Sequence, residues 1–203
     1  MKYFYAKQSS ALAAHILLEE AGAHYEAVEV SIADGDHRTA AFLDVNPKGR
    51  IPALQTSEGI ITENPAILEY IATTHPAACL MPQDRFSQAQ ARSLLGYICA
   101  TVHVAFAHHK RGARWVSSDA ALQDLKNKAP AELHTCAAHL ESTLAFSPWA
   151  LPHGFSLCDP YLYLIGGWMR GVGASLYDFP KLTAHAKAME SRPAVRAALE
   201  FYG

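Results

Sequence analysis

The sequence predicts an α/β domain followed by an all-helical domain. Strand-like and helix-like patterns alternate over the first eighty residues, prolines interrupt the chain between His75-Pro76 and Met81-Pro82, and the strand patterns then stop. The length of 203 residues suits one large domain or two small ones. We therefore expect domains at residues 1–78 and 87–203, joined by the proline-containing segment.

A strand-helix-strand unit opens the chain. Lys2–Tyr5 reads as a short aromatic strand, and Ala11–Ala21 is rich in helix-forming residues, with Gly22 placed to end the helix. Residues 28–32 then alternate apolar and polar side chains, which is the period of a half-buried strand. A helix between two strands implies that the strands pair in parallel.

The first domain continues with a looser segment, a hairpin and a helix. Residues 33–46 carry no clear period. Two short apolar runs, residues 51–55 and 60–62, flank the turn sequence Ser57-Glu58-Gly59, which predicts an antiparallel hairpin. Pro65 then suits the first turn of a helix that extends to about Thr74.

The second domain contains helical patterns. We expect helices at residues 86–111, 119–146 and 160–171, and one or two more within 177–200.

Composition excludes several classes of partner. The formal net charge of -2 and the pI of about 6.6 give no reason to expect nucleic acid or an anionic membrane surface. No apolar run is long enough to span a membrane, and the apolar stretch at Met1–Tyr5 is too short for a signal peptide. We expect a cytoplasmic protein.

The cysteines and histidines predict neither disulfides nor a metal. The four cysteines (Cys79, Cys99, Cys136 and Cys158) form no CxxC motif, and we interpret them as reduced and mostly buried. The chain has 11 histidines, but the pairs His108-His109 and His134/His139 lack carboxylates at ligand spacing. We therefore expect no metal.

Three positions in the first domain could carry chemistry. Pro52 lies just inside a strand, where it is either an edge-strand proline or a cis-proline that exposes the backbone of Ile51 to an extended ligand. Glu63 and Asn64 precede Pro65; they either cap the helix or hold the ammonium and carboxylate of an amino-acid head group. The order of these features is more informative than any one of them.

Two serines precede the first helix. Ser9 and Ser10 are ordinary N-cap residues, but a hydroxyl at a helix N-terminus can also meet an anion. A thiolate would be such an anion.

The succession of these motifs resembles the N-terminal domain of bacterial glutathione transferases. The most specific matches are Asn-Pro-Lys-Gly-Arg-Ile-Pro-Ala-Leu at residues 46–54 and Thr-Glu-Asn-Pro-Ala-Ile-Leu-Glu-Tyr-Ile at residues 62–71. In the second domain, residues 155–161 look like the capping box that opens the family's central helix, with Ser156 and Asp159 in the reciprocal positions. The resemblance covers essentially the whole chain, is closest to the beta class, and implies a thioredoxin-like first domain.

The resemblance implies a glutathione site on the first domain. Ile51, before a cis-Pro52, would pair its backbone with the cysteinyl unit. Glu63 and Asn64 would hold the γ-glutamyl end, where the family usually has serine in place of Asn64. His37 lies in the loop whose basic residue reaches the glycine carboxylate, a role for which Arg38 and Lys48 compete.

The resemblance also implies that Ser10 activates the glutathione thiol. The beta class typically has cysteine there, so redox chemistry is in doubt, whereas serine matches classes in which a hydroxyl donates to the sulfur. Ser9 and Tyr5 are the alternative donors, and Tyr5 also suits packing within its strand.

In the second domain, His103 matches a histidine that projects toward the sulfur in the beta class, or else is a helix residue without a chemical role. The lysine that usually follows it is Val104 here. An apolar electrophile would bind near Phe106, His109 and Trp115, although aromatic residues at such spacing are more often core.

The leading functional hypothesis is therefore conjugation of glutathione, as co-substrate, to an apolar electrophile by a homodimer. The first alternative is a glutathione-dependent isomerase or reductase, which the absence of cysteine from Ser9-Ser10-Ala11 makes less favoured. The second is a non-catalytic protein that binds glutathione or another ligand on the same fold.

Overall fold

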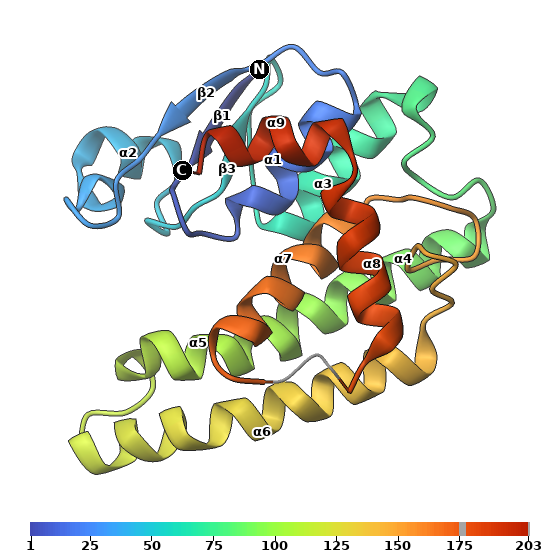
Figure 1. The fold of residues 1–203 in the computed structure, drawn as a ribbon. Coiled ribbons are helices and arrows are strands. Elements are labelled where there is room, and N and C mark those ends of the chain that lie inside the picture. The colour runs from blue at the N-terminus through green and yellow to red at the C-terminus, as the bar shows by residue number, and fades with distance from the viewer. Residues whose placement is uncertain (175–177, 203) are drawn as a thin grey trace. The chain divides into compact units, whose positions relative to one another are not determined.

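The computed structural model describes residues 1–174 and 178–202, and the chain divides into two compact units (Figure 1). The first unit comprises Met1–Gln88 and the end of the chain from Glu190, and the second comprises Ala89–Met189. We expected the division within residues 79–86 and all later residues in the helical domain. The difference arises because the last helix packs within the first unit.

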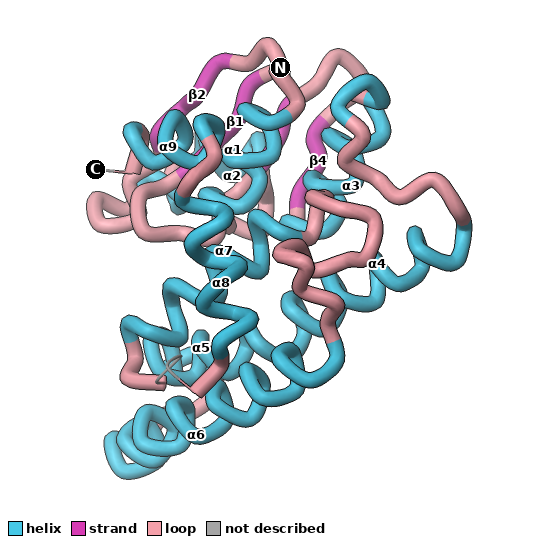
Figure 2. Tube along the Cα trace, turned by 45° about the vertical axis from the view of Figure 1, so that its right-hand side comes forward, coloured by secondary structure: helices cyan, strands magenta, loops and turns pink. Residues whose placement is uncertain are grey.

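A mixed sheet of four strands forms the centre of the first unit. The strands are β1 (Lys2–Tyr5), β2 (Glu26–Glu29), β3 (Ala53–Gln55) and β4 (Ile60–Thr62), in the order β2-β1-β3-β4. β1 pairs with β2 in parallel, while β1–β3 and β3–β4 are antiparallel. The predicted strand-helix-strand unit and hairpin are both confirmed. Figure 2 shows these strands in magenta, all within the first unit.

The second strand begins earlier than its pattern predicts. The alternation of apolar and polar residues predicted a strand at residues 28–32, but β2 spans Glu26–Glu29, in register with the four residues of β1. The ladder ends at Val30, whose N–H donates to the carbonyl of Tyr5 over 2.8 Å. Beyond that point β1 has turned away toward the first helix, and Ile32 is 48% exposed. The length of the partner strand, rather than the hydrophobic period, therefore limits β2.

The two faces of the sheet are covered by different helices. Successive side chains of a strand point to opposite faces, so Tyr3 and Phe4 face opposite ways. The Tyr3 hydroxyl donates to the carbonyl of Ala11, at the start of α1 (Ala11–Glu20). The Phe4 ring packs edge-on against Phe42 of α2 (Ala40–Val45), with centroids 6.0 Å apart.

The α2 helix is a correction to the sequence analysis, which treated residues 33–46 as irregular. The 3₁₀ turn Asp36–Arg38 precedes it, and the Thr39 hydroxyl caps it by accepting from the N–H of Phe42. A six-residue helix is too short to show a period, so its cap and its burial of Phe42 define it.

Three helices complete the first unit: α1, α3 (Asn64–Thr74) and α9 (Pro193–Glu200). Gly22 ends α1 as predicted, with φ of 60°, and the N–H of Ala23 donates to the carbonyl of Leu18 over 3.1 Å. The α1 and α9 helices lie side by side (Figure 1). The short 3₁₀ turn Pro76–Ala78 follows α3.

The second unit is helical, which confirms the predicted all-helical domain. The expected helix at residues 86–111 is α4 (Arg85–Tyr97), a π-helical stretch (Ile98–Val102) and α5 (His103–Arg111) in succession. The 3₁₀ turn Gly112–Arg114 follows, then α6 (Asp119–Thr143), α7 (Asp159–Gly171) and α8 (Pro180–Glu190). The α6 helix ends before the predicted Phe146, and the predicted start at Tyr177 lies outside the described residues.

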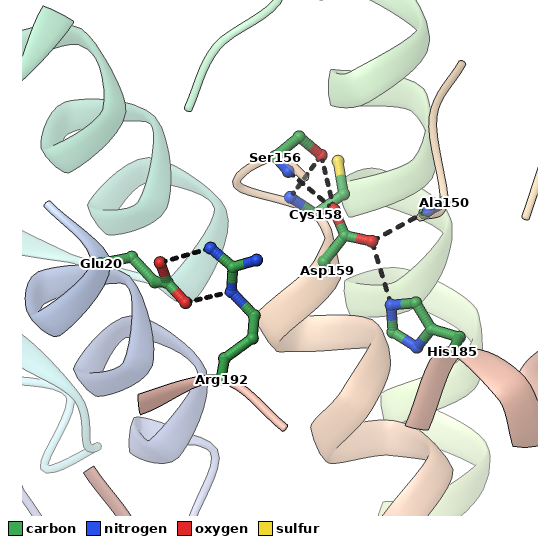
Figure 3. Close-up of polar contacts among 7 residues, drawn as sticks. All are labelled: Glu20, Ala150, Ser156, Cys158, Asp159, His185 and Arg192. Carbon is green, nitrogen blue, oxygen red and sulfur yellow. Dashed lines mark hydrogen bonds and ion pairs between the residues drawn. The ribbon is translucent and has the colours of Figure 1, made fainter. Parts of the chain in front are cut away.

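A buried carboxylate anchors the start of α7 (Figure 3). Asp159, with no exposed surface, accepts the backbone N–H of Ser156 over 2.7 Å and that of Ala150 over 2.9 Å. The Ser156 hydroxyl accepts from the N–H of Cys158, and His185 of α8 contacts Asp159 Oδ1, the oxygen that also accepts from Ala150, at 3.0 Å. Of the predicted capping box, the return bond from the Ser156 N–H to Asp159 is present, whereas the Ser156 hydroxyl accepts from Cys158, which is itself the residue that precedes α7.

The cysteines differ in exposure. Cys136 and Cys158 are buried, as expected for most of the four, whereas Cys79 is exposed and Cys99 is partly exposed. Among the described residues, no helix combines the length and apolar character that a membrane span requires.

Candidate active site

Ser9 and Ser10 stand at the N-terminus of α1 but make different contacts. The Ser9 hydroxyl donates to the carbonyl of Ala6 over 2.7 Å and accepts from the N–H of Ala11 over 3.2 Å. A hydroxyl group has a single hydrogen. The Ser9 hydrogen is therefore engaged within the loop, and Ser9 serves the local structure at the helix start.

Ser10 occupies the N-cap position itself. It is 8% exposed, and its side chain makes no capping hydrogen bond with the helix. The hydroxyl of Ser10 thus has a hydrogen to offer, beside the free N–H groups and the positive end of the helix dipole. An anion at this point would meet both.

Asn64, the first residue of α3, contacts Ser10 directly. Its side-chain Nδ2 donates to the carbonyl oxygen of Ser10 over 2.9 Å, and the residue is only 5% exposed. The other amide atom, Oδ1, is buried and has no hydrogen-bond partner within the described part of the chain. The motif left Asn64 as a helix cap or a ligand-binding residue, with the ligand role implied by the family resemblance, and the link between two helix N-termini is an additional contact.

Glu63 precedes α3 in a backbone conformation that is unusual for a residue with a side chain, with φ of 73°. Its exposed carboxylate forms an ion pair with the ammonium of Lys48, which also donates to the Thr62 hydroxyl over 2.7 Å. Lys48, considered for the glycine carboxylate, is thus engaged with Glu63. The Glu63 carboxylate thus already has an ammonium partner within the chain.

The peptide bond between Ile51 and Pro52 is cis, which decides between the two interpretations of that proline. Pro52 is buried and Ile51 is half-buried, immediately before β3 begins at Ala53. No backbone hydrogen bond of Ile51 is found among the described residues. Its N–H and C=O are therefore available to an extended ligand.

The loop before α2 contributes two basic residues. His37 is half-buried, and within the described chain its enclosed Nδ1 has no hydrogen-bond partner. Arg38 lies against Gly49: a Cβ atom at that glycine would be 2.9 Å from the Arg38 Nη1. Gly49 has φ of 57°, so glycine suits both its backbone conformation and this close approach.

Tyr5 packs in its strand. It is 6% exposed and meets the rings of His15 and Phe201 at centroid distances of 5.4 Å and 5.9 Å. Burial, together with the charge of Glu29, raises the pKa of the Tyr5 hydroxyl. These contacts favour its structural role over thiol activation.

In the second unit, both ring nitrogens of His103 are engaged. Arg111 Nη2 lies 3.1 Å from Nε2, and the Tyr161 hydroxyl lies 2.8 Å from Nδ1. A guanidinium group only donates, so Nε2 accepts and Nδ1 carries the hydrogen. His103 is therefore held as a neutral ring with a fixed tautomer, on which the indole of Trp168 packs edge-on.

The three residues expected near the electrophile have separate surroundings in this unit. Phe106 stacks on Trp168 with ring centroids 4.3 Å apart. His109 Nδ1 lies 3.3 Å from the carbonyl of Lys126. Trp115 is 49% exposed and meets His108 edge-on. Phe106 and His103 share one aromatic surface through Trp168, whereas no contact joins His109 or Trp115 to it among those described.

Comparison with known proteins agrees with this geometry. Residues 1–73 match the family model for the glutathione S-transferase N-terminal domain. The chain is 29% identical to glutathione S-transferase GstA of Escherichia coli O157:H7 over 210 residues, which covers 100% of this chain and 99% of that protein.

Two solved structures are similar over their full lengths. A glutathione transferase homologue from Sulfitobacter with bound glutathione has a TM-score of 0.94 at 35% identity, covering 98% of this chain and 97% of its own. The beta-class glutathione S-transferase of Sphingomonas chungbukensis has a TM-score of 0.86 at 35% identity, covering 100% and 99%. With the cis bond before Pro52, the paired N-termini of α1 and α3, and the two-unit fold, these matches show that the chain belongs to the glutathione S-transferase family.

Proposed function

We propose that the protein is an enzyme that ionises the thiol of glutathione and adds the thiolate to an apolar electrophile. The observation that carries this proposal is the Ser10 hydroxyl at the N-terminus of α1, whose side chain makes no capping bond while that of Ser9 is engaged. Family membership supplies the nature of the thiol.

The energetics of Ser10 are adequate for this role. A free thiol has a pKa of about 8.5, and the thiolate is the nucleophile. A hydrogen bond to a charged group contributes roughly 1.5–3 kcal/mol, and about 1.4 kcal/mol changes a pKa by one unit. One hydrogen bond from Ser10, assisted by the helix N-terminus, would lower the pKa of the bound thiol to a value close to neutral pH.

The remainder of glutathione would follow the first unit. The backbone of Ile51 pairs with the cysteinyl unit beside cis-Pro52, and Glu63 receives the γ-glutamyl ammonium on the oxygen that Lys48 leaves accessible. The N-terminus of α3 at Asn64 receives the γ-glutamyl carboxylate. His37, half-buried with an unpartnered Nδ1 in the described structure, or its neighbour Arg38, meets the glycine carboxylate.

The second substrate would meet the helical unit. His103, Phe106 and Trp168 form one continuous aromatic surface, which suits an apolar electrophile. Because both His103 ring nitrogens are bonded, its part is to shape that surface rather than to remove the thiol proton. His109 and Trp115, which were expected beside the electrophile, have no contact with this surface among the residues described.

We also propose a class and a setting for the enzyme. Ser10 in place of cysteine leaves no thiol to form a mixed disulfide with glutathione, so we place the protein among beta-class-like enzymes with serine-type chemistry. A role in detoxification, a homodimer and a cytoplasmic location complete the proposal.

Two measurements test this function. Titration calorimetry should detect glutathione binding, and Glu63→Gln should weaken it by roughly tenfold, the effect of losing one charge-assisted contact of about 1.4 kcal/mol. Conjugation of 1-chloro-2,4-dinitrobenzene, an apolar electrophile, should fall by roughly 10- to 100-fold in kcat/KM for Ser10→Ala. Binding without conjugation would favour a non-catalytic role, and no binding at millimolar glutathione would contradict the proposal.

A further inference from the structure

We infer that Asn64 is a positioning residue for thiol activation: its buried amide holds the backbone of Ser10, and so fixes the direction of the Ser10 hydroxyl. This inference rests on the proposed function, because it assumes that Ser10 donates to the glutathione sulfur. It adds a second role for a residue whose expected role was to hold the γ-glutamyl end.

The hydrogen bond has a defined direction. A carbonyl oxygen can only accept, so the amide group that faces Ser10 is the NH₂ group of Asn64. The Nδ2–O distance is 2.9 Å, whereas the N–H of Ala13 approaches the same carbonyl at 3.3 Å. The contact from α3 is therefore shorter than the contact from within α1. It is also buried, and burial strengthens a hydrogen bond.

The segment before Ser10 makes such a tether useful. Lys7 and Gln8 are exposed, and Gln8 has φ of 54°, so the chain turns sharply at the surface just before the helix. Ser9 is held by its own bond to Ala6. Asn64 fixes the next residue from a separate element that is 54 residues away in sequence. A displacement of about 1 Å in a catalytic group can cost about 100-fold in rate, so this restraint bears on chemistry.

The oxygen of the Asn64 amide shows that the contact with Ser10 is not free of cost. Asn64 Oδ1 is buried and, within the described structure, lacks a hydrogen-bond partner, which is unfavourable for folding. The bond to Ser10 is therefore made at a cost to the stability of the fold. The NH₂ group of Asn64 donates to the Ser10 carbonyl, and the Oδ1 atom of the same amide is buried as a consequence.

The tether also sets the relative placement of two anion sites. The N-terminus of α1 would face the glutathione thiolate, and that of α3 would face the γ-glutamyl carboxylate. Asn64 belongs to the second site and bonds to the backbone of the first. Substitution of Asn64 should therefore raise the pKa of the bound thiol even when the γ-glutamyl end of glutathione still binds.

Replacement by serine separates the two roles of Asn64. Asn64→Ser keeps a small hydroxyl donor at the start of α3, but its side chain is too short to reach the Ser10 carbonyl. Asn64→Ala removes both functions. Ser118→Ala is a matched control in the other unit, because it removes a side-chain bond at a helix start, here from the N–H of Ala121.

The experiment titrates the thiolate absorbance of bound glutathione in each protein and measures the affinity for S-methylglutathione, whose sulfur cannot ionise. We expect Asn64→Ser to raise the pKa of the bound thiol by about half a unit or more. Its affinity for S-methylglutathione should stay within about threefold of the wild type. Ser118→Ala should change neither quantity.

Two outcomes would overturn the inference. If Asn64→Ser leaves the thiol pKa unchanged while the wild-type thiol is shifted, Asn64 does not position Ser10. If Asn64→Ser weakens S-methylglutathione binding as much as Asn64→Ala does, with the thiol pKa unchanged, Asn64 acts only on the γ-glutamyl end. An unshifted thiol in the wild-type complex would instead overturn the proposed function, and the inference with it.

Discussion

Two adjacent serines differ in what their hydroxyl groups can do. Ser9 donates to the carbonyl of Ala6, whereas the side chain of Ser10 makes no capping bond. Both precede a helix and both are good capping residues, so their types alone cannot separate them. The difference depends on the path of the loop, which brings the Ala6 carbonyl to Ser9 and leaves the Ser10 side chain, although buried, without a capping bond.

His15 shows how completely a polar side chain can be enclosed. It has no exposed surface and lies among five aromatic rings, those of Tyr3, Tyr5, Tyr25, Phe201 and Tyr202. The Tyr25 hydroxyl donates to Glu19, so its oxygen accepts from His15 Nε2 at 2.8 Å. Burial lowers the pKa of His15 to about 4.

The low pKa of His15 predicts acid sensitivity. Between about pH 6.5 and pH 4 the unfolded chain binds a proton at this residue and the folded protein does not, so the free energy of unfolding falls as the pH is lowered. We expect the wild type to lose about 1 kcal/mol more than His15→Leu between pH 7 and pH 5.5, measured by urea unfolding. Equal losses in the two proteins would contradict this environment for His15.

At the scale of a single element, the start of α7 depends on one carboxylate. Asp159→Ala would leave two backbone N–H groups, one hydroxyl and one imidazole without their buried acceptor. We expect a loss of about 3 kcal/mol or more in the free energy of unfolding, against about 1 kcal/mol for Ser156→Ala. Chemical denaturation of both variants measures the difference, and similar losses would show that Asp159 is no more important than an ordinary cap.

The last helix is fixed to the first unit by a bidentate ion pair (Figure 3). Arg192, which precedes α9, donates through Nε and Nη2 to the two carboxylate oxygens of Glu20 at the end of α1. The Glu20 side chain is only 11% exposed, so solvent screens this pair less than a surface pair.

Arg192→Lys tests that attachment. Lysine keeps the charge but cannot form the two parallel bonds, so we expect about 1 kcal/mol of lost stability and faster hydrogen exchange within α9. Arg196→Lys is the control, because among the described residues Arg196 donates to the exposed carbonyls of Glu190 and Ser191 and to no carboxylate. Unchanged exchange in Arg192→Lys would mean that apolar packing alone holds α9.

At the scale of the whole molecule, local patterns predicted most of the element order. Gly22, Pro65 and the hairpin turn at residues 57–59 each mark a boundary through backbone chemistry that acts within a few residues. The sequence could not assign α9 to the first unit, because that depends on contacts such as Arg192 with Glu20, 172 residues apart in the chain. Helix patterns do not say which unit a helix joins.

The same contrast between local sequence patterns and long-range contacts applies to the candidate site. The order of motifs along the chain predicted Ser10 and Glu63 as site residues and offered a cis bond before Pro52, which the structure contains. The bond from Asn64 to Ser10 and the ion pair of Lys48 with Glu63 could not, since both join segments through the fold. Each of these contacts adds a partner within the chain to a residue whose role was implied by the family resemblance.

The most direct test of the account is the pKa of the thiol of bound glutathione, measured from its thiolate absorbance for the wild type, Ser10→Ala and Ser9→Ala. The account predicts a wild-type thiol that ionises about one unit or more below free glutathione, a shift that Ser10→Ala loses and Ser9→Ala retains. An unshifted thiol in the wild-type complex, or a shift that depends on Ser9 and not on Ser10, would contradict it.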